Sequence, residues 1–215
     1  MQPQEGIIKF QLDYTPTAGL SFDQLREINA WRKIMHLLQL IGQTPERYGG
    51  YGYGNISRRL ELFDAPATHR QFVISGTQTG SLAELTALHY TIVLECYPMQ
   101  NRLVAAGPAK PSAESLTHGT IYALDNDLRW VIHVHSPHIW RHAAALQLPL
   151  TSPDVSYGSP EMAAEVRRLF NETPAKARRI FAMGGHEDGV VAFGRTAQET
   201  GTVLVNYLAQ ALALA

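Results

Sequence analysis

Apolar side chains recur at helical spacing in the stretch that follows Ser21. They are Leu25, Ile28, Trp31, Met35, Leu38 and Ile41. Residues three and four apart share one face of a helix, so this spacing predicts an amphipathic helix. Ser21 and Gln24 have the spacing of a capping box, and Gly42 is a natural stop, so we expect the helix over residues 21–42.

Short apolar runs bounded by turn residues predict the strands of a sheet. The expected strands cover residues 58–63, 71–75, 90–97, 103–106, 130–135, 179–183 and 190–193. Helices are expected over residues 112–126, residues 137–146, a stretch opening at Ser159-Pro160 and a final stretch opening at Thr196, with a short helical turn at residues 82–89. Glu199 completes a second capping box with Thr196. Strands and helices alternate without an internal repeat or an interdomain linker, which predicts one layered α/β domain over residues 1–215.

The composition is that of an ordinary globular protein, with 45% apolar residues, 17% charged residues and a net charge of −1. Basic pairs such as Arg58-Arg59 and Arg178-Arg179 are scattered, which argues against nucleic acid as a partner. Cys96 is the only cysteine, so there is no disulfide framework, and a reducing cytoplasm fits. We expect no membrane contact, because no secretory signal is visible and no apolar run reaches the roughly 20 residues of a membrane span.

Two histidines, His133 and His135, close the apolar run of residues 130–132. Residues two apart on a strand point to the same face, so the two imidazoles are expected side by side. His186, which follows two glycines, is a candidate third ligand, and Glu114 is a candidate acid/base. Three histidines leave a tetrahedral metal ion one open position, which is the pattern of a catalytic metal site.

The histidine pair and the glutamate also have structural explanations. Two histidines at a strand end can simply hydrogen-bond, and an acid in the first turn of a helix is stabilised by the helix dipole. His138 and His142 lie four residues apart on one expected helix face and form a rival metal set with the strand histidines, which leaves His186 unexplained. Packing, surface, turn or supporting roles are expected for the others: His36, His69, His89 and His118.

Four short segments form an ordered set along the chain. They are Gly54-Asn55-Ile56-Ser57-Arg58, Thr79-Gly80, Pro111-Ser112-Ala113-Glu114 with His118 four residues on, and His133-Val134-His135 followed later by His186. This set resembles the class II aldolase/adducin family, and with its flanking elements the resemblance covers roughly residues 48–208. The family includes fuculose phosphate aldolases, ribulose phosphate epimerases and methylthioribulose phosphate dehydratases. The resemblance implies a single α/β/α domain with a central mixed sheet.

The resemblance also implies roles for particular residues. It assigns a divalent metal, usually Zn²⁺, to His133, His135 and His186, and the acid/base to Glu114. A metal with imidazole ligands is a Lewis acid that polarises a carbonyl, which agrees with the chemistry expected from the histidines alone. Family members are commonly fourfold rings with active sites between neighbours, so we expect a cytoplasmic homotetramer.

The glycine loops match family positions that hold a substrate phosphate. These positions are Gly54, Asn55, Thr79, Gly80, Ser112 and Ala113. Glycine lets backbone N–H groups approach an anion closely, and a helix start adds further N–H donors. Any one loop is better explained as a turn, but the three together favour an anion site.

Three departures from the family pattern concern the substrate. Ala113 stands where the family often has a second serine, which removes a hydroxyl from the expected phosphate site. Residues 150–154 offer no tyrosine where fuculose phosphate aldolases supply a tyrosine acid from the neighbouring subunit, and Tyr157 aligns better with an aromatic residue before the next helix. Glu187 and Asp188 stand where the family usually has glycine directly after the histidine.

We therefore expect a metal-dependent, aldolase-type lyase that acts on a small hydroxy-carbonyl compound, in particular a sugar phosphate. Epimerisation and dehydration can be built on the same residues and stay open. A non-catalytic interaction module, as in adducin heads, is the alternative from a different class. A binding role would not need an open metal position, so the candidate ligand set argues against it.

Overall fold

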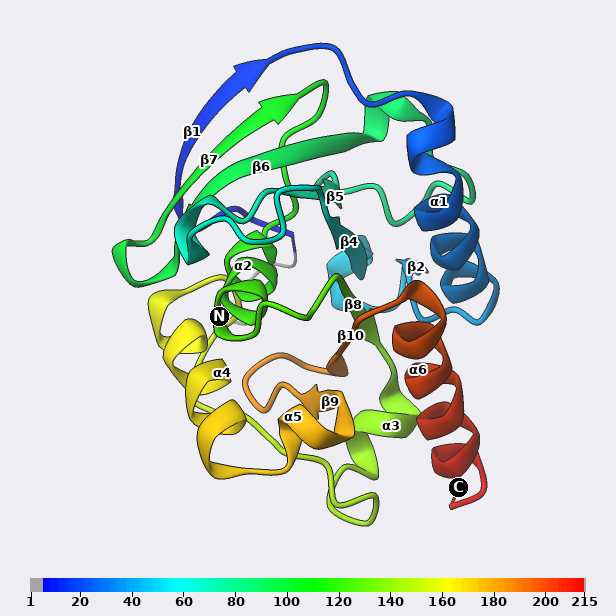
Figure 1. Cartoon of the computed structure of the whole chain (residues 1–215). Coiled ribbons are helices and arrows are strands. Elements are labelled where there is room, and N and C mark those ends of the chain that lie inside the picture. Colours follow the sequence, from blue (N-terminus) through cyan, green and yellow to red (C-terminus); the bar gives the residue numbers. More distant parts are fainter. Residues whose placement is uncertain (1–5, 215) are drawn as a thin grey trace.

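The computed structural model describes residues 6–214 and has a central sheet of eight strands (Figure 1). In chain order the strands are β1 (Gln11–Pro16), β4 (Asn55–Arg59), β5 (Phe72–Ser75), β6 (Tyr90–Tyr97), β7 (Arg102–Gly107), β8 (Trp130–His135), β9 (Ile180–Ala182) and β10 (Gly189–Gly194). Across the sheet their order is β1-β7-β6-β5-β4-β8-β10-β9. β1 pairs with β7 in parallel and the other neighbours pair antiparallel, so the sheet is mixed, as expected.

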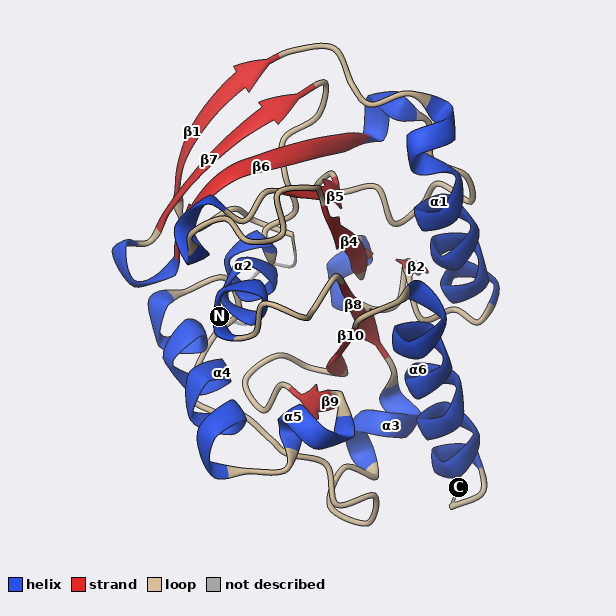
Figure 2. Ribbon diagram, in the orientation of Figure 1, coloured by secondary structure: helices blue, strands red, loops and turns tan. Residues whose placement is uncertain are grey.

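Helices cover both faces of this sheet (Figure 2). One face carries α2 (Ser115–Leu124), α4 (Pro160–Glu172) and α5 (Ala175–Arg178), and the other carries α1 (Phe22–Leu37), α3 (Pro137–Arg141) and α6 (Ala197–Leu212). Each face has its own apolar core. Neighbouring strand residues point to opposite faces, so Val131 packs with the α2 layer and Ile132 with the α1 layer. The layered α/β/α architecture expected from the sequence is confirmed.

Short elements complete the chain. A separate two-stranded sheet joins β2 (Gly42–Gln43) to β3 (Gly52–Tyr53). The 3₁₀ helices are η1 (Tyr48–Gly50), η2 (Ala67–His69), η3 (Ala87–His89) and η4 (Pro98–Gln100). Within residues 6–214, none of the helices combines the length and the apolar character that crossing a membrane requires.

The ends of several elements differ from the expectation. The Ser21–Gln24 capping box is formed, but α1 ends at Leu37 and Gln39 turns left-handed, so Gly42 starts β2 instead of stopping the helix. The helix expected over residues 137–146 is only α3, followed by turns. Thr196 caps α6 by accepting from the backbone of Glu199, but the Glu199 carboxylate accepts from Arg195, so the second capping box is half formed.

The sequence analysis placed one strand at the wrong residues and did not predict another. The expected strand at residues 58–63 lies at Asn55–Arg59, because this stretch pairs on both sides, with β5 and with β8. Beyond it the chain turns away, and Leu62 has a left-handed backbone. β1 has a partly exposed pattern and lies at the sheet edge beside β7, so it has no strong apolar alternation by which to predict it.

Candidate metal centre

His133 and His135 end β8, which lies between β4 and β10 near one end of the sheet. Both are fully buried, and they share the strand parity of Val131, which faces the α2 layer. The Nε2 atoms of the two rings lie 3.1 Å apart. The expected side-by-side arrangement is therefore present.

His186 reaches this pair from the loop between β9 and β10. Its ring centroid lies 5.2 Å from that of His133 and 4.7 Å from that of His135. Two glycines bring the loop close, because a Cβ on Gly184 would overlap the carbonyl of Thr151 and one on Gly185 would overlap that of Val155. One ring nitrogen of each histidine lies within 4.8 Å of the others, and in the part of the chain that the structure describes this is the one such donor group found.

The donor set fits a divalent metal. Two nitrogens bound at about 2.0–2.1 Å to one tetrahedral ion lie about 3.3 Å apart, close to the spacing of the strand pair. A histidine must be neutral to bind a metal. Burial lowers the pKa of His135 well below its ordinary value, and the neighbouring His186, His133 and Arg47 lower it further. The ring is therefore held in the neutral form that ligation requires.

Glu114 lies beside these histidines at the N-cap of α2, with its side chain buried. Its Oε1 is 3.1 Å from Nδ1 of His186, and Thr117 Oγ1 donates to its Oε2 at 3.0 Å. Burial would raise its pKa, but the contacts with His186, His133 and Thr117 outweigh burial and lower the pKa to about 2. The carboxylate is therefore ionised at neutral pH.

The local geometry around Glu114 differs from the expectation. The helix begins at Ser115, so Glu114 precedes the first turn, and no side-chain cap bond is formed. Ser112 Oγ instead accepts from the backbone N of Glu114 at 3.3 Å. The carboxylate points to the histidines, so stabilisation of the helix dipole alone does not explain it.

The expected anion-binding residues gather in one small pocket next to Glu114. Its lining includes Gly52, Gly54, Asn55, Gly76, Thr77, Gln78, Thr79, Gly80, Ser112, Ala113 and Glu114. Asn55 pairs in register with His133, so the pocket adjoins the histidine cluster. The Oδ1 of Asn55 is buried without a hydrogen-bond partner among the described residues.

Glycine is required at two positions of this lining. Gly54 has a φ of +76°, and a Cβ there would lie 2.7 Å from Ile41 Cγ1 and 3.1 Å from the carbonyl of His133. A Cβ on Gly80 would overlap the carbonyl of Gly42 and lie 2.8 Å from the Cα of Gly52. Both glycines let backbone strands approach each other at the edge of the pocket.

Tyrosine rings surround the histidines, which the sequence did not predict. The ring centroid of Tyr48 lies 4.6 Å from that of His135, that of Tyr53 5.4 Å from His135, and that of Tyr157 4.7 Å from His186. Tyr48 Oη donates to Asp188 Oδ2 at 2.6 Å. Burial and this carboxylate raise the pKa of Tyr48, so it stays a neutral phenol. The tyrosine-rich stretch at residues 48–53 and the acidic pair after His186 were the available signals.

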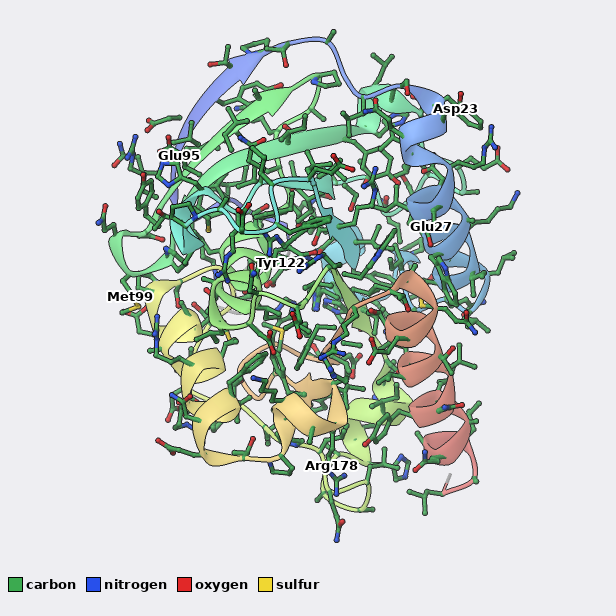
Figure 3. The ribbon with its side chains drawn as sticks, viewed as in Figure 1. Asp23, Glu27, Glu95, Met99, Tyr122 and Arg178 are labelled. Atoms are coloured by element: carbon green, nitrogen blue, oxygen red, sulfur yellow. The ribbon has the colours of Figure 1, made fainter. Side chains whose placement is uncertain are left out.

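A buried hydrogen-bonded set lies one turn further along α2. Ser57 Oγ lies 2.7 Å from His118 Nδ1 and 2.7 Å from Tyr122 Oη. Figure 3 shows Tyr122 in the interior, in contrast to the peripheral Met99 and Arg178. His118 is therefore a buried supporting residue, in line with the expectation.

The rival metal set does not come together. The Nδ1 of His142 lies 2.9 Å from the carbonyl oxygen of His138, so these two residues interact along their own turn. His138 is exposed, whereas the three histidines of the cluster are buried. Of the remaining histidines, His69 faces Glu95 at 3.7 Å and His89 accepts from the backbone of Thr86.

Comparison with solved structures gives the same fold. L-fuculose-1-phosphate aldolase from Thermus thermophilus is 19% identical, with a TM-score of 0.63 over 88% of this chain and 91% of that one. A sugar-phosphate aldolase from Thermotoga maritima is 15% identical, with a TM-score of 0.65 over 89% and 93%. YgbL from Klebsiella pneumoniae, a candidate aldolase/epimerase/decarboxylase, is 18% identical, with a TM-score of 0.62 over 91% and 90%.

Sequence comparison identifies the family. None of the curated proteins matches the chain. The family model described as Class II Aldolase and Adducin N-terminal domain matches residues 45–212, a span that runs from the loop before Tyr48 to the end of α6. With most of its length matched, the chain belongs to the class II aldolase and adducin N-terminal domain family.

Proposed function

We propose that this protein is a divalent-metal-dependent, aldolase-type lyase that acts on a small hydroxy-carbonyl compound of the sugar-phosphate class. One observation carries the proposal: the three histidines, an ionised Glu114 and the glycine-lined pocket adjoin one another. Class II aldolases depend on divalent metals. Two proteins of similar fold are named as aldolases of sugar phosphates, which supports the same substrate class here.

His133, His135 and His186 are the proposed metal ligands. Three buried imidazoles that leave one position open favour Zn²⁺ among the common divalent ions. When bound, such an ion supplies a Lewis acid that polarises a substrate carbonyl. Because an ionised carboxylate can only accept, the contact with Glu114 Oε1 favours the proton of His186 on Nδ1 and leaves its Nε2 lone pair for ligation.

Glu114 is the proposed acid/base. Thr117 and His186 hold the two carboxylate oxygens in place, and the carboxylate takes up the substrate proton and returns it. The carboxylate is ionised at rest and so has no proton of its own to lose before it accepts one. Cleavage of a carbon–carbon bond, epimerisation and dehydration all need a proton moved at this position, and they differ in their products.

The glycine-lined pocket is the proposed phosphate site. Gly54, Thr79 and Gly80 offer backbone N–H groups to an anion, Asn55 an amide and Ser112 a hydroxyl, while the Thr79 hydroxyl donates to the carbonyl of Gly76. Ala113 adds no hydroxyl. Phosphate binding therefore depends on backbone donors more than it does where a second serine is present.

Assays of the zinc-loaded protein with phosphorylated and free hydroxy-carbonyl compounds test this proposal. Cleavage into an aldehyde and a phosphorylated ketone is the expected outcome, and Glu114→Gln is expected to lower turnover by about 10²–10⁴-fold while the fold is retained. Glu187→Gln is the matched control, because Glu187 is exposed on the loop of His186. Isomers or dehydrated products would favour the epimerase or dehydratase alternative. Near wild-type turnover of Glu114→Gln would contradict the acid/base role.

A further inference from the structure

We propose that Tyr48 and Asp188 form a brace that positions two of the proposed ligands, His135 and His186. The brace consists of these two residues and the hydrogen bond between them. The inference rests on the proposed metal function. It goes beyond that function because it assigns a positioning role to two residues outside the ligand and acid/base set.

The brace touches one ligand directly and the loop of another. The Tyr48 ring lies edge-on to the His135 ring, with centroids 4.6 Å apart and planes at 68°. Its hydroxyl donates to Asp188 Oδ2 at 2.6 Å. Asp188 is two residues after His186, so one tyrosine links the ring of His135 to the loop that carries His186.

Asp188 also fixes the end of β8. Its backbone carbonyl accepts from the N–H of Ser136, the residue directly after His135, at 2.8 Å. Its side chain is 6% exposed, and Arg47 lies 3.4 Å from the same Oδ2 while also contacting the Tyr48 hydroxyl. Arg47 thus balances the buried charge, and the carboxylate stays available as the acceptor for Tyr48.

The backbone at both ends of the brace is in a conformation that side chains rarely adopt. Tyr48 has a φ of +51° and Asp188 a φ of +61°. Such positions are strained for residues other than glycine, and they persist where surrounding contacts over-determine them. The two residues meet each other next to the histidine cluster, and the hydrogen bond between them joins these two turns.

Groups around metal ligands tune the metal by holding the ligands in place, and their loss typically costs about 10–100-fold in affinity. Tyr48→Phe removes only the hydroxyl and keeps the ring on His135. Asp188→Gly removes the carboxylate at a φ that glycine accepts without strain, whereas Asp188→Asn keeps an oxygen acceptor. These variants separate the hydrogen bond from the packing of the ring and from the backbone.

The test measures Zn²⁺ affinity by competition with a chelating dye and the visible absorption spectrum of the Co²⁺-loaded protein. We expect about tenfold weaker zinc binding for Tyr48→Phe and about 10–100-fold weaker binding for Asp188→Gly, whereas Asp188→Asn, which keeps an oxygen acceptor, should lose less affinity than either. The Co²⁺ absorption bands should shift in the two weaker variants, because the ligand geometry changes. If the Tyr48–Asp188 pair only stabilised the fold, the Co²⁺ bands of the loaded variants would match those of the wild type.

Two control variants are matched to the brace. Glu187→Gln changes the exposed neighbour of Asp188, and Tyr97→Phe removes a tyrosine–carboxylate bond of 2.8 Å, to Glu95 on β6. Both should bind zinc as the wild type does. If Tyr48→Phe shows wild-type affinity and an unchanged Co²⁺ spectrum, the brace is contradicted while the proposed function stands. If the wild type itself binds no zinc, both proposals fall.

Discussion

His118 lies one turn after Glu114 on α2, fully buried, with its Nδ1 2.7 Å from Ser57 Oγ. Burial, with the nearby His133, lowers its pKa to about 3, and the Glu114 carboxylate opposes this only in part. The ring therefore stays neutral in the folded protein at pH values where an unfolded histidine is charged. His118 therefore contributes to the pH dependence of folding.

The sign of that dependence follows from proton uptake. Between its ordinary pKa of 6.5 and its folded pKa of about 3, His118 binds more protons in the unfolded state, so its contribution to stability is lost as pH falls. From pH 8 to pH 5 this contribution falls by about 2 kcal/mol. We expect the unfolding free energy of wild type to fall by about that much more than that of His118→Gln in urea titrations of metal-free protein. Parallel pH profiles would contradict the neutral buried state.

The sequence predicted site residues correctly as neighbours where both the residue type and the spacing along the chain indicate a metal site. His133, His135, His186 and Glu114 were predicted as neighbours, and their side chains lie together. Tyr48 was not predicted as a neighbour of these residues. It lies in a glycine-rich loop, where no regular spacing indicates which residues its ring packs against. Its partner Asp188 was visible only as an unexplained acid after the histidine.

At the scale of elements, α2 carries Glu114 and packs on β6 through Gly119. A Cβ at Gly119 would overlap Cys96 Sγ and lie 3.0 Å from Cys96 Cβ. The glycine therefore sets the distance between the helix and the sheet. A larger residue at position 119 is expected to shift α2, and with it Glu114 at the N-cap of that helix.

Gly119→Ala tests this contact, because packing and helix propensity predict opposite changes in the free energy of unfolding. Alanine in a helix interior is normally favoured over glycine by about 0.5–1 kcal/mol. We expect a loss of about 1–3 kcal/mol instead, since overpacking a buried contact is destabilising. Cys96→Ala removes the overlapping sulfur, so chemical unfolding of the double variant should show a smaller loss than the sum of the singles. Additive or stabilising effects would contradict the packing argument.

The strands were predicted best where the chain has a continuous apolar run. β8 and β5 are buried along their whole length and lie within a residue of the expected ranges. α3 is shorter than its pattern because its apolar residues continue into turns that still pack on the core, as Leu146 does. Burial alone does not distinguish a helix from a packed turn.

At the scale of the whole molecule, two helices on one face leave apolar side chains exposed. Leu37 on α1 is 72% exposed, and Leu212 on α6 is 51% exposed. α1 and α6 contact each other along this face (Figure 1). Exposed apolar side chains can contribute to an interface between subunits, and the family resemblance leads us to expect a homo-oligomer.

We expect a homotetramer of about 95 kDa, four times the chain mass of 23.8 kDa. Light scattering coupled to size exclusion at micromolar concentration measures this mass directly. The tetramer should persist in the Tyr97→Phe control, whose substitution lies on β6. A species of one chain mass at that concentration would contradict the assembly.

The central claim is a metal centre on His133, His135 and His186, and metal analysis of the zinc-loaded protein tests it most directly. We expect about one Zn²⁺ per chain. His133→Ala and His186→Ala should each weaken binding by more than about 100-fold, beyond the effect of residues that only surround ligands. His142→Ala, from the rival set, should bind zinc as the wild type does. No bound metal after zinc loading, or full affinity in His186→Ala, would contradict the account.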